Sequence, residues 1–189
     1  QGEVVIGEVG AKYAEPSMRG NSFPWATVTA ASVTAIGNNI PSLWNPRGSG
    51  VMTVVTKVTI QAAAIGTPAV SGFQYGILND AGSQVGTASP VITGTLIAGI
   101  STSPGSMRTP KTLFMGFVCT YTVAPTLLGP VGVNLGSTAT QIPWTAVDDV
   151  DGRIVLHPGG LLQVGASTAT STTFNVGFWG YEVPLPLTG

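Results

Sequence analysis

Three aspartates close together are the strongest candidates for chemistry in this sequence. Asp148, Asp149 and Asp151 precede Gly152, and carboxylate oxygens are the ligands that Ca²⁺ prefers in proteins. The alternating ligands and the distal glutamate of an EF-hand loop are missing, however, and an aspartate-rich turn ahead of a strand is common. We therefore expect a structural turn and no metal site, with Ca²⁺ binding as the alternative.

The remaining reactive residue types lack the partners that catalysis needs. His157, the single histidine, stands beside Pro158, and no nucleophile elbow accompanies it. Gly159 and Gly160 lack the lysine and the strand-to-helix context of a phosphate-binding loop. The lone cysteine, Cys119, lies in an apolar alternating run that is typical of a small buried side chain. We expect no catalytic residue, no cofactor and no enzymatic activity.

Four tryptophans provide flat apolar rings that could stack on sugars. Trp44 precedes a loop and Trp25 follows Pro24, so either side chain could face outward. Anchoring in a core or in a contact between subunits is the commoner use of this residue type. The residues expected to pack in this way are Trp144, Phe174, Phe178 and Trp179.

The composition restricts the partners of the chain. Only 8% of its 189 residues are charged and 43% are hydrophobic, whereas about 25% of the residues in soluble domains carry charge. A lone domain covers its surface with charged side chains, so we expect copies of the chain or a partner to cover much of this surface. The net charge of −1, without a basic run, argues against direct nucleic-acid binding. No apolar stretch approaches the length of a membrane span.

Alternation with period two recurs along the chain, as β-strands require. It is clearest at Val51–Ala62, and 26 glycines and 14 prolines leave little room for helices. Strands are also predicted at Ala26–Ile36, Phe73–Leu78, Val91–Ile100, Leu113–Val123, Gly132–Leu135, Ile142–Thr145, Ile154–Leu156, Leu161–Gly165 and Thr172–Val183. Both faces of the last strand can be occupied, which predicts a central place in a sheet. This pattern is typical of an all-β sandwich.

The first residues of the chain differ from the rest in their charge. Residues 1–21 hold five of the 15 charged residues, whereas residues 22–189 carry the predicted strands. We interpret residues 1–21 as an extended arm that docks on a neighbouring protein, with a frayed terminus as the alternative. The charged residues of the arm are Glu3, Glu8, Lys12, Glu15 and Arg19.

Three spaced fragments between Ser42 and Pro184 resemble small jelly-roll subunits on tailed-phage particles. In those proteins a stretch like NP.GSG precedes a long early strand, and a stretch like lhPGg.l.v precedes a closing strand that ends near W.yEvP. The matching fragments here are Asn45-Pro46-Arg47-Gly48-Ser49-Gly50, Leu156-His157-Pro158-Gly159-Gly160-Leu161 and Trp179-Gly180-Tyr181-Glu182-Val183-Pro184. The resemblance implies a jelly-roll sandwich of about eight strands that forms homotrimers similar to those of tumour-necrosis-factor-like domains.

The resemblance also implies a function. It indicates a virion structural protein, a trimeric decoration or cement protein that binds the major capsid protein and stabilises the bacteriophage head. Such a protein is assembled in the host cytoplasm and ends on the capsid surface. The alternative is the host-recognition head domain of a phage fibre or spike, which would bind surface glycans. A secreted signalling trimer is a third interpretation.

Overall fold

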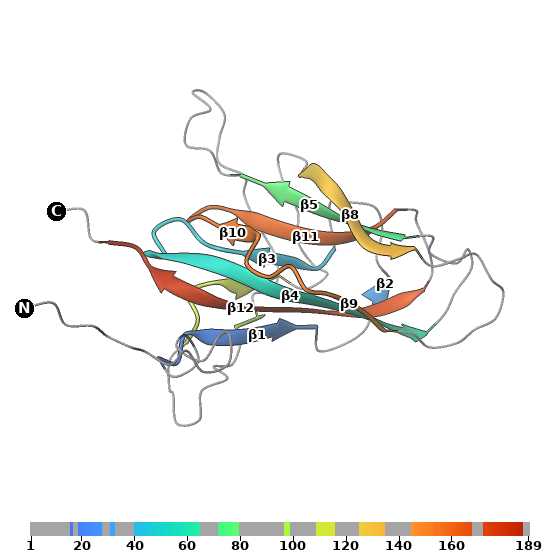
Figure 1. The fold of residues 1–189 in the computed structure, drawn as a ribbon, viewed down its shortest axis with the longest axis horizontal. Coiled ribbons are helices and arrows are strands. Elements are labelled where there is room, and N and C mark those ends of the chain that lie inside the picture. Colours follow the sequence, from blue (N-terminus) through green and yellow to red (C-terminus); the bar gives the residue numbers. More distant parts are fainter. Residues whose placement is uncertain are drawn as a thin grey trace, which may run out of the picture.

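The protein is built from β-strands in two antiparallel sheets (Figure 1). The structure, a computed structural model, describes residues 16, 19–27, 31–32, 40–64, 72–79, 97–98, 109–115, 125–134, 145–167 and 172–186. The first sheet contains β1 (Ser22–Ala26), β2 (Ala31–Ser32), β4 (Val51–Ala64), β9 (Thr145–Asp148), β10 (Ile154–Leu156) and β12 (Thr173–Pro184). The second contains β3 (Ser42–Trp44), β5 (Gly72–Leu78), β6 (Ile97–Ala98), β7 (Leu113–Phe114), β8 (Thr126–Asn134) and β11 (Leu161–Ala166). The predicted all-β sandwich is confirmed.

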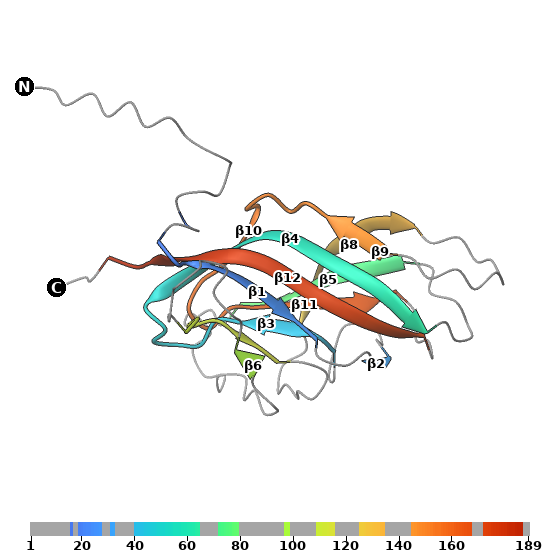
Figure 2. The same cartoon turned by 90° about the horizontal axis from the view of Figure 1, so that it is seen from below.

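The closing strand β12 lies in the middle of the first sheet. The strand order of this sheet is β1-β12-β4-β10, with β2 also on β12 and β9 also on β4, and Figure 2 shows β1, β12 and β4 side by side. The second sheet has the order β6-β7-β3-β11-β5-β8. The central place predicted for the last strand is therefore confirmed. The repeated crossing of the chain between the sheets favours the jelly-roll interpretation, which stays a prediction.

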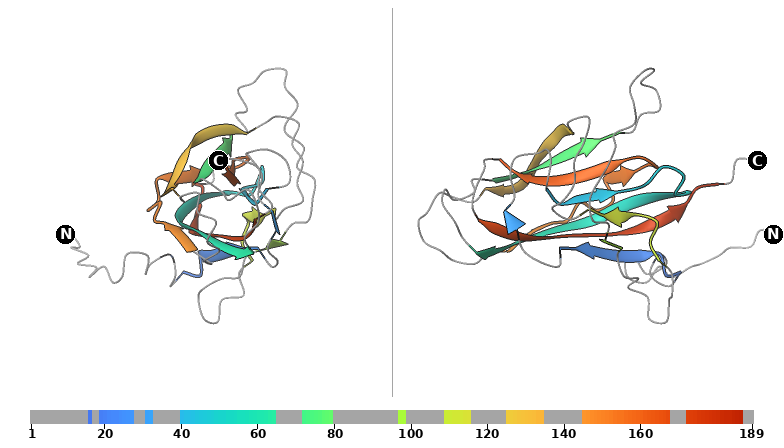
Figure 3. Two further views of the ribbon diagram at one scale, coloured as in Figure 1. Left: turned by 90° about the vertical axis from the view of Figure 1, so that its right-hand side faces the viewer. Right: turned by 180° about the vertical axis from the view of Figure 1, so that it is seen from behind.

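Aromatic rings fill the space between the two sheets, which surround a common interior in the end-on view of Figure 3. Phe174 and Phe178 alternate with outward residues along β12, and both are fully buried. Phe174 packs edge-on against Phe73 of β5 at 5.0 Å between ring centroids. Phe178 packs against Phe114 of β7 at 6.0 Å. Each ring of β12 thus contacts the opposite sheet, in a geometry that aromatic pairs prefer.

Two strands begin earlier than the sequence predicted, and both contain a proline. The strand expected at Ala26–Ile36 overlaps β1 (Ser22–Ala26) only at Ala26 and contains β2 (Ala31–Ser32), and Pro24 lies inside β1. The strand expected at Gly132–Leu135 is the end of β8, which includes Pro130. Proline is tolerated on strands at the edge of a sheet, and β1 and β8 end the described strand orders. Both prolines thus lie within strands and not in the segments between them.

Other boundaries also differ from the sequence prediction. The short strand β3 was missed because Pro41 and Asn45-Pro46 enclose it. Of the strand expected at Ile142–Thr145, only Thr145, the first residue of β9, falls within the described residues. Of the strands expected at Val91–Ile100 and Leu113–Val123, only β6 and β7 fall within the described residues. Trp25, a candidate for the surface, is 1% exposed and belongs to the core.

Asn45 joins two of the sequence fragments inside the protein. Its buried amide nitrogen Nδ2 donates to the carbonyls of Val51 at 2.8 Å and Leu156 at 2.9 Å. Its backbone nitrogen donates to the carbonyl of Gly160 at 2.9 Å, and its own carbonyl accepts from the nitrogen of Gly159 at 2.6 Å. The fragment that starts at Asn45 and the Pro-Gly-Gly turn are therefore one structural joint, since each satisfies the backbone groups of the other.

Thr112 forms a second joint, between the first sheet and the segment that leads into β7. Its backbone nitrogen and that of Lys111 donate to Oε1 of the buried Glu182, at 2.7 Å and 2.6 Å. Its carbonyl accepts from Nε1 of Trp25 at 3.1 Å. Its hydroxyl forms a hydrogen bond with the hydroxyl of Thr53. Three strands of the first sheet, β1, β4 and β12, thus converge on one residue.

Replacement of Asn45 by alanine will test the first joint. We expect Asn45→Ala to lower the free energy of unfolding by about 2 to 4 kcal/mol, because two buried carbonyls lose their donor. Urea denaturation measures this loss. The exposed Asn79 is the matched control, and Asn79→Ala should stay within about 0.5 kcal/mol of the parent protein. Equal effects of the two substitutions would contradict the assignment.

Candidate functional site

A β-bulge shapes the outer face of the first sheet. Strand β12 pairs with β4 along its whole length, but the register shifts between Trp179, which faces Lys57, and Gly180, which faces Val55. Thr56 is therefore the extra residue of the bulge. Its hydroxyl donates to the carbonyl of Trp179 at 3.1 Å. The bulge fixes the backbone from which the Trp179 indole projects.

The aspartate-rich turn fits against this bulge. Strands β9 and β10 both pair with β4, and residues 149–153 separate them beside Thr56. The backbone nitrogens of Asp151 and Gly152 donate to the carbonyls of Thr56 at 2.8 Å and Val55 at 3.0 Å. Asp151 and Gly152 adopt φ values of 56° and 79°, a region in which aspartate and glycine are favoured. The turn expected from the sequence thus lies against β4.

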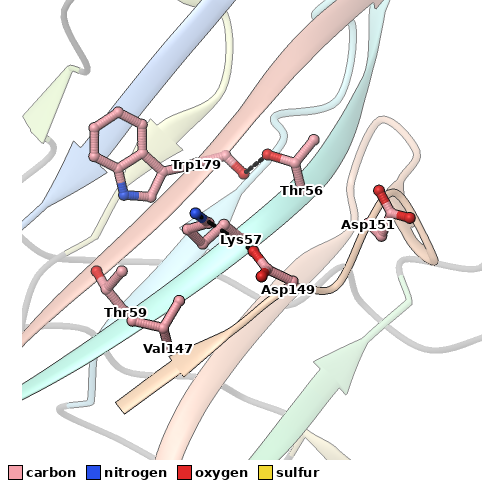
Figure 4. Close-up of a pocket in the computed structure, with 7 residues that line it drawn as sticks. All are labelled: Thr56, Lys57, Thr59, Val147, Asp149, Asp151 and Trp179. Atoms are coloured by element: carbon pink, nitrogen blue, oxygen red, sulfur yellow. Dashed lines mark hydrogen bonds and ion pairs between the residues drawn. The ribbon is translucent and has the colours of Figure 1, made fainter. Parts of the chain in front are cut away.

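A groove opens on this face between β12, β4 and the turn after β9 (Figure 4). It has a volume of about 790 Å³ and is lined by Thr56, Lys57, Thr59, Val147, Asp149, Asp151 and Trp179. The Trp179 indole lies to one side of Lys57, and the Asp149 carboxylate to the other. Lys57 Nζ is 3.4 Å from Asp149 Oδ1, and the two side chains are 44% and 74% exposed. Such an exposed pair contributes little stability and leaves both groups accessible to a ligand.

Two glycines of β12 let strand β4 approach β12 closely beside the groove. A Cβ atom at Gly180 would lie 2.3 Å from the carbonyl oxygen of Val54, so no other residue fits the bulge without movement of the backbone. A Cβ atom at Gly177 would lie 2.6 Å from Oγ1 of Thr59. The Thr59 hydroxyl instead donates to the Gly177 carbonyl at 3.4 Å. The absence of side chains at Gly177 and Gly180 thus lets β12 and β4, which carry the groove residues, lie close together.

The structure does not bring the three aspartates together as a calcium site. Asp148 accepts a hydrogen bond from the Tyr75 hydroxyl at 2.8 Å, Asp149 faces Lys57, and Asp151 lies on the turn beside the bulge. Within the described ranges, no group of three or more His, Cys, Asp or Glu residues could hold a metal ion. The Ca²⁺ alternative therefore has no support from these residues.

The residues predicted to pack have different environments. Phe174 and Phe178 lie in the core, whereas Trp179 is 43% exposed in the single chain. Trp144 lies outside the described residues. Packing of Trp179 against another subunit stays a prediction. His157, the other reactive candidate, is exposed in the turn between β10 and β11, where its carbonyl accepts from the nitrogen of Gly160 at 2.8 Å.

The predicted arm falls largely outside the described residues. This holds for Glu3, Glu8, Lys12 and Glu15. Arg19 is described, and it is exposed in a turn before β1. The last residue of the predicted arm, Asn21, is buried, and its carbonyl accepts from the backbone nitrogen of Glu182 at 2.9 Å. The ordered sandwich thus includes the end of the segment assigned to the arm.

Sequence reasoning missed the groove residues Lys57, Thr59 and Val147. Lys57 carries the only charge in β4, and its place on the outward side of a long apolar strand was the available signal. Val147 is 52% exposed, which a branched apolar residue does not indicate from sequence. The approach of Asp149 to Lys57 follows from the pairing of Asp148 with Val58, a register that residue types do not give.

Similarity to other proteins does not identify the function. Comparison of the chain with protein-family models, curated proteins and solved structures gives no match. In the part of the chain that the structure describes, no helix has the length and apolar character needed to span a membrane.

A hydrogen bond beside the groove links the two sheets. Tyr75 of β5 is 6% exposed, and its hydroxyl donates to Oδ2 of Asp148 in β9 at 2.8 Å. Burial raises the pKa of the Tyr75 phenol well above its ordinary value of 10.0, and the hydrogen bond to Asp148 raises this pKa further. The folded protein thus binds the proton of the Tyr75 phenol more tightly than the unfolded chain does.

Stability should therefore fall at alkaline pH. The contribution of Tyr75 is fully present below the unfolded pKa of 10.0 and is lost as pH rises above it, at up to about 1.4 kcal/mol per pH unit. Urea denaturation between about pH 8 and pH 11.5 measures this dependence. We expect Tyr75→Phe to be less stable at neutral pH and to show a flatter alkaline decline. An unchanged alkaline slope in this variant would disprove the role of Tyr75.

Proposed function

We propose that the protein is a structural subunit of a virus particle, which acts as a homotrimer on the capsid surface. The observation that carries this proposal is the adjacent pair Leu127 and Leu128 in β8, whose side chains are 57% and 49% exposed. Strand β8 carries no charged residue. A chain with so few charges elsewhere gains most from association where large apolar side chains meet water.

The geometry of β8 explains why both leucines are exposed. Leu127 pairs with Gly76 and Gly129 pairs with Tyr75, so Leu128 is the extra residue of a bulge. Burial of one leucine side chain contributes about 1.5 to 3 kcal/mol. Pro130 lies in the same strand, and proline on an edge strand opposes the addition of another strand. Contact through side chains therefore fits β8 better than extension of the sheet.

The arm provides the proposed attachment to the capsid. Five charged residues between Glu3 and Arg19 contrast with the low charge of the sandwich and supply polar contacts for the major capsid protein. Three arms on one trimer would bind with a high effective concentration. The proposed role is that of a decoration or cement protein, which links neighbouring capsid subunits and stabilises the shell.

A host-recognition head that binds surface glycans is the second candidate function. The exposed indole of Trp179 beside Lys57 and Asp149 supports it. This interpretation predicts exposed aromatic residues clustered at the end of the sandwich distal to the N-terminal arm. Trp179 instead lies within the central strand β12 of the first sheet. The capsid role therefore stays the first candidate.

Sedimentation equilibrium will test the association through β8. We expect the parent protein to have a mass three times that of the 19.2 kDa chain at micromolar concentration. The double variant Leu127→Ser/Leu128→Ser should sediment as a single chain, because its contact loses two apolar side chains. Val155→Ser changes another exposed apolar residue, 40% exposed in β10, and should keep the parent mass. A parent protein that sediments as a single chain would refute the trimer.

Deletion of residues 1–15 will test the capsid attachment. This deletion keeps Pro16, whose carbonyl accepts from the nitrogen of Asn21 at 2.9 Å, so the start of the sandwich is preserved. We expect a folded trimer that no longer co-sediments with capsids stripped of the protein. The full chain is the control, and equal occupancy of the two proteins on capsids would exclude docking by the arm.

A further inference from the structure

The exposed indole of Trp179 is an exception among the described aromatic residues. The phenylalanines in the core and Trp25 are at most 2% exposed, whereas Trp179 is 43% exposed. The indole also borders a groove of about 790 Å³, a volume within the range of small-molecule sites, which is about 300 to 1,000 Å³. The exposed ring therefore forms one wall of a concave site.

The polar groups of the groove indicate what kind of ligand it fits. Two of the seven lining residues are apolar, Val147 and Trp179, and the other five carry hydroxyl, ammonium or carboxylate groups. The lining thus combines a largely apolar surface with several polar groups. A ligand with one apolar face and many hydroxyl groups fits it well.

The charged residues of the groove further restrict the class of ligand that it can bind. Lys57 contributes one positive charge, and Asp149 and Asp151 contribute two negative charges. Lys57 is paired with Asp149 at 3.4 Å, and the Arg153 guanidinium donates to the Asp149 carbonyl at 3.5 Å, so positive and negative charges beside the groove are balanced. Phosphate, sulfate and carboxylate ligands therefore find no excess of positive charge here. A neutral ligand can accept hydrogen bonds from the ammonium group and donate hydrogen bonds to the carboxylates.

We propose that this groove binds a neutral saccharide, with one sugar ring stacked on the Trp179 indole. The apolar face formed by the C–H groups of a pyranose ring matches the flat indole. The hydroxyl groups on the edge of the ring then bond to Lys57, which pairs with Trp179 across the two strands, and to Asp149 on the other side of Lys57 (Figure 4). This site is separate from the leucines of β8, and it does not depend on the proposed capsid role.

The site is largely formed before a ligand arrives. Trp179 projects from the central strand of the sheet, and its carbonyl is held by the Thr56 hydroxyl at 3.1 Å. The turn that carries Asp149 is fixed by two backbone hydrogen bonds to β4, from Asp151 and Gly152. A preformed site avoids part of the entropic cost of ordering protein groups on binding. This matters for saccharides, because each of their polar contacts is weak.

Binding to defined oligosaccharides will test the site. The full chain, in its assembled form, is screened against neutral oligomers of glucose, galactose and mannose and against sialylated and uronic oligosaccharides. The best ligand is then titrated by calorimetry. We expect neutral oligosaccharides to bind with a Kd near or below about 1 mM, and acidic ones at least about tenfold more weakly. Trp179→Ala should weaken binding by about tenfold or more.

Three further variants separate stacking from general damage to the fold. Trp179→Phe keeps a flat ring and should recover most of the affinity that Trp179→Ala loses, whereas Asp149→Ala should weaken binding without changing the melting temperature. Val155→Ser removes an exposed apolar residue of the same sheet outside the groove and should bind like the parent protein.

Several results would overturn the saccharide site. They are no detectable binding of neutral oligosaccharides up to millimolar concentration, a preference for acidic oligosaccharides, and unchanged affinity of the Trp179→Ala variant. A lower oligomeric mass of the Trp179→Ala variant in sedimentation equilibrium would also overturn it, because Trp179 would then pack between subunits. The double leucine variant reports on the β8 contact alone, so failure of the proposed trimer and failure of the saccharide site are distinguishable.

Discussion

The hydrogen bonds at Thr112 are the constraint on which the rest of the fold depends. Thr112 is fully buried, and its nitrogen, carbonyl and hydroxyl are bonded to Glu182, Trp25 and Thr53. Buried polar groups are costly when they lose their partners, so β1, β4 and β12 have one favourable position relative to the opposite sheet. Two of these strands, β4 and β12, also carry the bulge at Thr56 and the Trp179 indole.

Much of the fold could be predicted from the sequence because apolar alternation is a direct consequence of strand geometry. Strands β4, β5 and β12 follow it, whereas β10 and β11 are short apolar runs on either side of the Pro-Gly-Gly turn. Prolines hid β1 and part of β8, since the tolerance of an edge strand for proline depends on neighbours that a sequence does not show. The fragments singled out by resemblance contain Asn45, Gly159 and Glu182, all of which have structural contacts within the protein.

The candidate groove could not be predicted in the same way. Alternation correctly separates Trp179 from the inward Phe178, but it does not show whether the outward face is covered. The pairing of Lys57 with Asp149 brings together residues far apart in the sequence, and it follows from the register of β9 on β4, in which Asp148 faces Val58. The Asp-Gly pair indicated a turn, but not the strand against which that turn packs.

The central place of β12 has a consequence for biosynthesis. The first sheet needs β12 between β1 and β4, yet β12 is made after every other described strand. While the chain is still on the ribosome, Phe23 and Trp25 of β1 lack the strand that pairs with β1. Chains emerge at about 5 to 20 residues per second, so these side chains stay uncovered for several seconds. Protection of the nascent chain by a chaperone would matter most during this interval.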